Sequence, residues 1–192
     1  MSEKQTVEPS TSTEDRIIQA AFALIGEKGL GAVTMSQIAH EAGVARQTLY
    51  NHYEDIDSII AATIKRHNSE SVALLEISLQ IADSPIDRLE QMVRHVASIG
   101  AHTHQTVDLR GALAVELQAG LGEYQNVVES HISAIIVEGQ ETGGFRSDIN
   151  VAIDTVLIRS LLDGVRDLAA RSPEQAAQIA TAGTHTIVAA LS

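Results

Sequence analysis

The sequence predicts an all-α protein, and three observations carry this prediction. Aromatic residues make up only 3% of the 192 residues, whereas β-strands favour aromatic and β-branched side chains. Only three prolines interrupt the chain, which leaves room for long helices. Ala, Ile, Leu, Gln and Glu are abundant, and most of them favour helix. The length permits one large helical domain or a small domain plus a larger one.

The composition excludes several classes of protein. The chain has no cysteine, so disulfide scaffolds, thiolate zinc sites and cysteine nucleophiles are excluded. No apolar stretch reaches the roughly 18 to 20 residues of a membrane helix, and we expect a cytoplasmic protein with no membrane partner. The formal net charge is -12, from 13 Lys+Arg and 25 Asp+Glu. Taken alone, this charge argues against nucleic-acid binding.

The chain begins with a polar segment and a first helix. Residues 1–12 lack periodicity and are expected to form a disordered arm. Thr13 is expected to be the N-cap of a helix that ends near Lys28 and Gly29. The helix is predicted because the apolar residues of 17–25 recur at helical spacing.

The second helix is short and has two start signals. Thr34 and Gln37 are spaced as a capping box, in which each side chain accepts a hydrogen bond from the backbone N–H of the other residue. Val33 and Ile38 are spaced as a hydrophobic staple across the same helix start. These signals predict a helix over 35–41.

A tight turn and a third helix are expected directly afterwards. Gly43 is able to adopt the positive φ that ends the second helix, and the third helix is expected over 45–52. The small Ala39 is expected at the contact between the two helices, and Leu49 is expected to point inward. Two short helices joined in this way are typical of a DNA-binding helix-turn-helix unit.

The outward face of the third helix carries the candidate DNA contacts. Its side chains form hydrogen bonds of the kind used at base edges and phosphates, and none of them is a carboxylate. These residues are Arg46, Gln47, Thr48, Tyr50, Asn51 and His52. Thr34 and Ser36, at the start of the second helix, are expected either to contact phosphate or only to cap the helix. For Tyr50 and His52 the alternative is packing against neighbouring helices.

Residues 34–53, TMSQIAHEAGVARQTLYNHY, resemble the signature of the TetR family of bacterial transcription regulators. The resemblance implies a homodimeric repressor that binds a palindromic operator in double-stranded DNA and is released by a small-molecule effector. It implies a helix-turn-helix domain at 13–55 and a ligand-binding and dimerisation domain at 56–192, with a connecting helix over 56–82. No cofactor is expected.

Other functions remain open at this point. The first alternative is a DNA-binding activator or a ligand-blind regulator of the same fold. The second is a small helical enzyme, for which the sequence shows no Ser-His-Asp arrangement, no glycine-rich phosphate loop and no pair of histidines at metal-binding spacing on one helix face.

Two positions depart from the pattern of the family. Ala45 stands where the family often has serine, so the third helix lacks a side-chain N-cap. Ile56 stands where many members have a lysine that binds phosphate. Either another residue supplies that charge, or the salt dependence of DNA binding is shallower by about one counterion per subunit. Residues 1–66 contain six basic and nine acidic side chains. Most of the acidity therefore lies elsewhere, and binding is expected to depend on neutral donors and on the avidity of a dimer.

The larger domain is expected to contain six helices and no internal repeat. Glycines at 100, 120, 122 and 143–144 are predicted to separate them, together with Ser84 and Pro85. The expected helices are 56–81, 86–99, 107–119, 124–141, 150–170 and 173–191.

The last two helices are the candidates for a dimer interface. One stripe consists of Val156, Leu157, Ser160, Leu161, Gly164 and Leu168. A second stripe consists of the small or apolar residues Ala176, Ala180, Gly183, Ile187 and Ala190. Two helices from each subunit would form a four-helix interface. The alternative is that the stripes belong to the core of one subunit.

The effector site is expected among the middle helices, where polar side chains stand in an apolar context. The candidate contacts are Arg110, Glu116, Gln118, Tyr124 and His131, and each is also explained as an ordinary surface residue. The many aliphatic side chains favour an apolar or amphipathic effector. A metal site is not expected. The residues of suitable type are His102, His104, Asp108 and His131, and solvated or buried histidines account for them.

Overall fold

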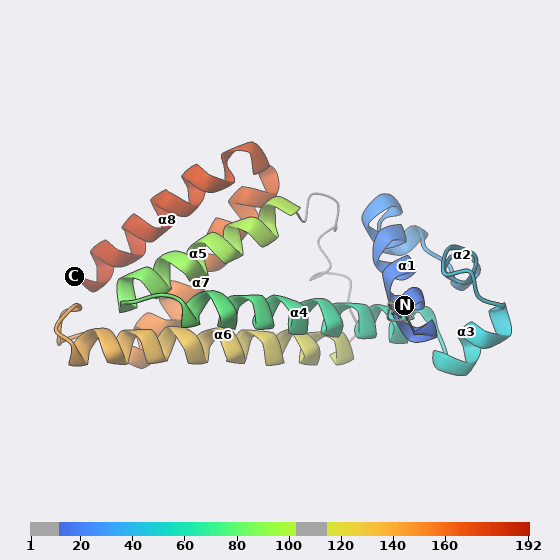
Figure 1. Cartoon of the computed structure of the whole chain (residues 1–192), viewed down its shortest axis with the longest axis horizontal. Coiled ribbons are helices and arrows are strands. Elements are labelled where there is room, and N and C mark those ends of the chain that lie inside the picture. Colours follow the sequence, from blue (N-terminus) through green and yellow to red (C-terminus); the bar gives the residue numbers. More distant parts are fainter. Residues whose placement is uncertain (1–11, 103–114) are drawn as a thin grey trace, which may run out of the picture. The chain divides into compact units, whose positions relative to one another are not determined.

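The computed structural model describes residues 12–102 and 115–192, and these residues form helices without any strand (Figure 1). The all-α prediction is confirmed. The chain divides into two compact units, and the division falls between Arg66 and His67 inside the long helix α4 (Ile56–Gln80). Within the described ranges, no helix is long and apolar enough to cross a membrane.

The N-terminal unit is built from the expected short helices. They are α1 (Thr13–Lys28), the 3-10 helix η1 (Leu30–Ala32), α2 (Met35–Glu41), α3 (Arg46–His52) and the first part of α4. α2 contacts both α1 and α3, and Ile17, Ile38 and Leu49 are fully buried in the core of this unit. The inward orientation predicted for Leu49 is confirmed, and Ala39 is buried as expected.

The first helix is capped one residue earlier than the sequence analysis predicts. Ser12, not Thr13, is the N-cap of α1: Ser12 Oγ accepts the backbone N–H of Asp15 at 3.0 Å, and Asp15 Oδ2 accepts the backbone N–H of Ser12 at 3.1 Å. A capping box needs an acceptor side chain three residues after the cap. Asp15 supplies it for Ser12, whereas Thr13 would have Arg16 at that position.

The start of α2 and the turn that follows agree with the sequence analysis. Thr34 Oγ1 accepts the backbone N–H of Gln37 at 3.3 Å, and Gln37 Oε1 accepts the backbone N–H of Thr34 at 2.9 Å. The predicted capping box is therefore confirmed. Gly43 has φ 62° between α2 and α3, a conformation that strains a residue with a side chain. Ala45 precedes α3 and makes no side-chain cap.

The C-terminal unit contains the rest of α4 and the remaining helices, except for the first two residues of α6. They are α5 (Pro85–His102), α6 (Val115–Glu141), α7 (Val151–Arg171), the 3-10 helix η2 (Pro173–Gln175) and α8 (Ala176–Leu191). α5 packs against α7 and α8, which also pack against each other. The core completely buries Met92 and Val93 of α5, Ile132 and Ile136 of α6, and Ile187 of α8.

Three glycines predicted to separate helices lie inside helices instead. α5 continues through Gly100, and α6 is continuous through Gly120 and Gly122. The described part of the segment 107–119, predicted as a separate helix, belongs to α6. At Gly100 the reason is close packing, because a Cβ added there would lie 2.3 Å from the backbone oxygen of Arg166 in α7. This glycine therefore permits a contact between two helices rather than a turn.

Gly100→Ala is expected to destabilise the C-terminal unit, because its methyl group would overlap a backbone oxygen. Overpacking of this kind costs about 1–3 kcal/mol of unfolding free energy. Urea denaturation followed by circular dichroism measures the loss. Gly26→Ala in α1 is the control: a Cβ there has no atom within 4 Å, and both variants gain the helix preference of alanine. Equal stability of the two variants would contradict the close contact at Gly100.

Candidate nucleic-acid interface

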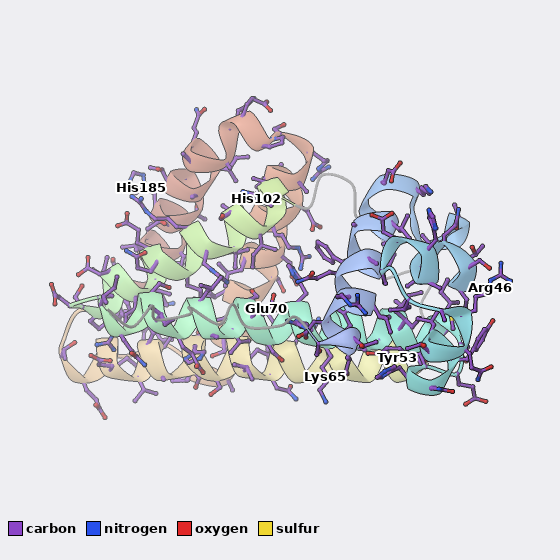
Figure 2. All side chains as sticks on the ribbon, turned by 45° about the vertical axis from the view of Figure 1, so that its right-hand side comes forward. Arg46, Tyr53, Lys65, Glu70, His102 and His185 are labelled. Carbon is purple, nitrogen blue, oxygen red and sulfur yellow. The ribbon has the colours of Figure 1, made fainter. Side chains whose placement is uncertain are left out.

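The outward face of α3 carries polar and aromatic side chains on a packed frame. Leu49 is fully buried, which turns the opposite side of this short helix to solvent. The exposed residues of α3 are Arg46, Gln47, Tyr50, Asn51 and His52, while Thr48 has intermediate exposure. Gln47 and Asn51 lie opposite Leu49, and the others flank them. Figure 2 shows Arg46 extending away from the ribbon. The predicted set therefore shares one accessible surface, and its contact with DNA stays a prediction.

Two side chains on this face are connected to each other. Gln47 Nε2 donates a hydrogen bond to Asn51 Oδ1 at 3.1 Å, one helical turn away. The bond leaves the oxygen of Gln47 and the amide nitrogen of Asn51 to pair with base edges. The ring centroid of His52 lies 6.5 Å from that of Tyr53, yet His52 remains exposed.

The start of α2 supplies two hydroxyl groups. Thr34 is exposed, but its Oγ1 donates to Gln37 Oε1 at 2.9 Å in addition to capping the helix. Ser36 lies in the first turn of α2 with intermediate exposure. The capping role is therefore present for Thr34, and a phosphate contact stays a prediction for both residues.

Positive charge is scarce on this interface. Arg46 is the one lysine or arginine in residues 34–56. Ile56 is the first residue of α4, and the neighbouring Asp55 Oδ1 accepts the backbone N–H of Ser58 at 2.8 Å. The start of α4 thus carries a carboxylate and an apolar side chain, rather than a cation that could bind phosphate.

A second group of contacts holds α1 to α4 and to the residue after α3. Asp15 forms an ion pair with Arg66, and Tyr53 Oη donates to Glu14 Oε1 at 3.3 Å. Burial, together with the charge of Glu14, raises the pKa of Tyr53 to about 12, so the phenol stays a neutral donor. Sequence reasoning missed both contacts, since the partners lie 51 and 39 residues apart in the chain.

The effector-site candidates are placed only in part. Arg110 lies outside the described residues. Glu116, Gln118 and Tyr124 belong to α6, but their side chains are also outside the described part of the chain. The side chain of His131 is partly buried, and its Nε2 lies 3.9 Å from Glu76 Oε1 of α4. An effector contact of His131 stays a prediction.

The residues considered for a metal site are not brought together in the described ranges. His104 and Asp108 lie outside them. His102 is exposed at the end of α5, where its Nδ1 lies 2.6 Å from Ser98 O (Figure 2). The described residues contain no group of three side chains arranged to hold a metal ion.

The stripe on α7 is open to solvent in the single chain. All six of its members are exposed: Val156, Leu157, Ser160, Leu161, Gly164 and Leu168. A shallow groove of about 400 Å³ adjoins it, lined by Leu157 and Leu161 of α7 and by Ala190 and Leu191 of α8, among others. This surface is both apolar and accessible.

The stripe on α8 faces mostly the core of the C-terminal unit. Ala180 and Ile187 are buried in the core of the C-terminal unit, and Ala176 packs against that core. A Cβ added at Gly183 would lie 2.7 Å from Val165 Cγ2 of α7. Ala180 and Ile187 thus belong to the core of the chain itself, which was the alternative in the sequence analysis, while Ala176 and Gly183 keep intermediate exposure. A dimer interface on α8 stays a prediction. Ala190 alone among the stripe is exposed.

Comparison with known proteins gives a consistent result. Residues 17–63 match the family described as bacterial regulatory proteins, tetR family. An uncharacterised HTH-type transcriptional regulator of Mycobacterium tuberculosis (strain CDC 1551 / Oshkosh) is 26% identical over 176 residues, which cover 84% of this chain and 89% of the relative. This relative is named as a regulator and not as an enzyme.

Two solved structures share the fold. The fatty acid degradation regulator FadR from Bacillus halodurans has a TM-score of 0.80 at 20% identity, covering 94% of this chain and 97% of its own. The regulator FadR from Bacillus subtilis, solved with stearoyl-CoA, has a TM-score of 0.78 at 18% identity. The match covers 92% of this chain and 98% of the FadR chain. At these identities the likeness establishes the fold, a helix-turn-helix unit followed by a larger helical unit.

Asp15→Asn is expected to lower the thermal stability of the N-terminal unit at neutral pH. Hydrogen bonds from Arg66, and then from Ser12, hold the pKa of Asp15 below its ordinary value of 3.8. The charged carboxylate thus favours the folded state. Its contribution is present above about pH 4 and is lost as the pH falls through the lowered pKa.

Thermal unfolding measured from about pH 7 to about pH 2 checks this expectation. The wild type and Asp15→Asn should differ at neutral pH and converge at the acid end. Glu27→Gln, on an exposed position of α1, is the control and should change little. A difference that persists unchanged at the lowest pH would argue against the ion pair.

Proposed function

Because the chain belongs to the TetR family of bacterial regulatory proteins and is a helix-turn-helix transcriptional regulator, we propose that it is a ligand-responsive repressor. A homodimer binds a palindromic operator in the bacterial cytoplasm, and a small-molecule effector releases it. One observation carries the proposal: the exposed face of α3 bears hydrogen-bonding side chains and no carboxylate, while Leu49 is fully buried on the opposite side.

The proposed DNA contacts divide by position on the helices. Arg46 and Gln47 lie in the first turn of α3, where a recognition helix reads base edges in the major groove. Tyr50 and Ser36 are proposed to contact the phosphate backbone. Neutral donors supply most of these contacts. The affinity for DNA should therefore depend less on salt than that of a helix-turn-helix unit with additional cations.

A two-fold symmetric operator requires two helix-turn-helix units, and hence a dimer. We place the dimer interface on the outer side of α7 and α8. Leu157 and Leu168 are 56% and 50% exposed, and a continuous apolar stripe of this kind marks an interaction surface. On α8 the residues opposite the core include the exposed Ala182 and Ala189, which permit close approach of a second helix. The groove beside Leu161 would receive side chains of the partner.

The larger unit is proposed to bind the effector. Bacillus subtilis FadR was solved with stearoyl-CoA, an amphipathic molecule, which supports the expectation of an apolar or amphipathic effector. α4 is one continuous helix with residues in both units. An effector that favours a different position of α4 would therefore change the spacing between the helix-turn-helix units of the two subunits. A ligand-blind regulator would show no such change in operator affinity.

Selection of bound sequences from a random duplex pool tests the DNA-binding half of the proposal. A palindromic consensus is expected, and a pool with no enriched sequence would count against it. On the selected operator, Arg46→Ala and Tyr50→Ala should each weaken binding by about fivefold to 150-fold, since a lost base or backbone contact costs about 1–3 kcal/mol. Arg94→Ala, an exposed arginine on α5, is the control and should leave the affinity unchanged.

Leu161→Glu is expected to shift the protein from dimer to monomer, because the carboxylate would be buried without a partner in the proposed interface. Sedimentation velocity of the full chain measures the change, with a dimer dissociation constant raised at least tenfold, or about 1.4 kcal/mol. Leu74→Glu is the matched control, since Leu74 is 62% exposed on α4, outside the stripe. Dimers of Leu161→Glu as stable as the wild type would remove α7 from the interface.

A further inference from the structure

A small polar cluster lies between α4 and α5 in the C-terminal unit. Ser71 Oγ of α4 lies 3.0 Å from His95 Nε2 of α5, and Ser71 is only 7% exposed. Asn68 stands three residues before Ser71, so the two side chains share one face of α4. The hydroxyl of Ser71 and the imidazole of His95 thus meet between the two helices, and the amide of Asn68 lies one turn away on the same face of α4.

The amide of Asn68 is the unusual member of this cluster. Its Nδ2 is buried, and among the described residues it has no hydrogen-bond partner. A buried donor without a partner loses its bonds to water and gains nothing in return. An apolar residue of similar size would avoid this cost, so stability of the protein alone does not account for asparagine at this position.

The surroundings of the cluster on α4 and α5 are apolar, and none of the Asp, Glu, Lys or Arg side chains of these two helices is buried. The partly buried charges of the neighbouring helix α7 pair with one another, as Arg159 and Arg166 do with Asp163. Leu75 and Met92, one turn along the same two helices, are 1% and 0% exposed. The charged neighbours point elsewhere: Glu76 is exposed and lies beside His131, and Arg94 is exposed and pairs with Glu90. Burial lowers the pKa of His95, so its ring is neutral at pH 7. The cluster therefore offers neutral hydrogen-bonding groups only.

We infer that Asn68, Ser71 and His95 hold a neutral hydrogen-bonding group, a carbonyl or a hydroxyl, at one end of an otherwise apolar effector. The inference rests on the proposed function, which requires an effector. Asn68 Nδ2 donates to the oxygen of this group, and the Ser71–His95 pair donates or accepts according to the tautomer of the ring. A carboxylate or an ammonium ion would lose its hydration here without meeting an opposite charge, so the cluster selects against both.

Four eight-carbon probes that differ only in their polar group test this inference: n-octanol, methyl hexyl ketone, octanoate and octylamine. Binding to the full chain is measured without DNA, by isothermal titration and by the shift in Tm. The alcohol or the ketone should bind and raise Tm, at least tenfold more tightly than octanoate and octylamine. Tighter binding of either charged probe, or binding of none of the four, overturns the inference.

Variants then assign the binding to the cluster. Asn68→Leu should bind the neutral probe at least tenfold more weakly, while its Tm without probe equals or exceeds that of the wild type. Ser71→Ala, a smaller change, should also weaken binding, which keeps the test decisive if Asn68→Leu folds poorly. Asn126→Leu, at an exposed position of α6, is the matched control and should bind normally. Wild-type affinity in both cluster variants refutes the assignment.

The two proposals fail in different ways. Loss of the proposed function would appear as the absence of a specific operator in the duplex selection, where no probe is present. Loss of the present inference would appear in the probe titrations, where no DNA is present. Specific operator binding together with unselective probe binding would leave the regulator intact and remove the cluster as its effector contact.

Discussion

Burial of Leu49, with Ile17 and Ile38, in the core of the N-terminal unit is the constraint on which the proposed DNA-reading surface of α3 depends. α3 has only seven residues, too few to be a stable helix in isolation, so its orientation comes from this packing. Once Leu49 points inward, Gln47 and Asn51 on the opposite side must point outward, and Arg46 and Tyr50 are exposed beside them. The turn at Gly43 and the capping box at α2 set the angle at which α3 leaves the core.

In the same unit, the acidic side chains at the start of α1 are paired with other residues of the unit, and a single arginine remains on the outward face of α3. The acidic side chains Glu14 and Asp15 at the start of α1 are engaged by Tyr53 and Arg66, which keeps them in an internal network. Arg46 is left as the cation of the outward face. Specificity in such a DNA-binding unit depends on hydrogen bonds more than on attraction to phosphate, and the proposed dimer would compensate for the modest affinity of one unit.

The C-terminal unit keeps two features that a protein selected for stability alone would avoid. Leu157 and Leu168 lie exposed on α7, and the buried amide of Asn68 has no partner among the described residues. Exposed apolar stripes and unpaired buried donors both cost free energy in the isolated chain. The first cost is recovered if a partner subunit covers the stripe on α7, and the second if a ligand pairs with the amide of Asn68. A ligand-responsive dimer needs both contacts.

The sequence by itself determined the helical class, the bounds of α2, the turn at Gly43 and the outward face of α3. These follow from signals between residues a few positions apart, such as Thr34 with Gln37. Only the tertiary structure decided that Gly100 packs against α7, that Ile187 faces the core of its own subunit, and that Ser71 meets His95. The physical reason is that helical periodicity shows which residues share a face, whereas the neighbour that covers this face is chosen by packing between segments distant in the chain.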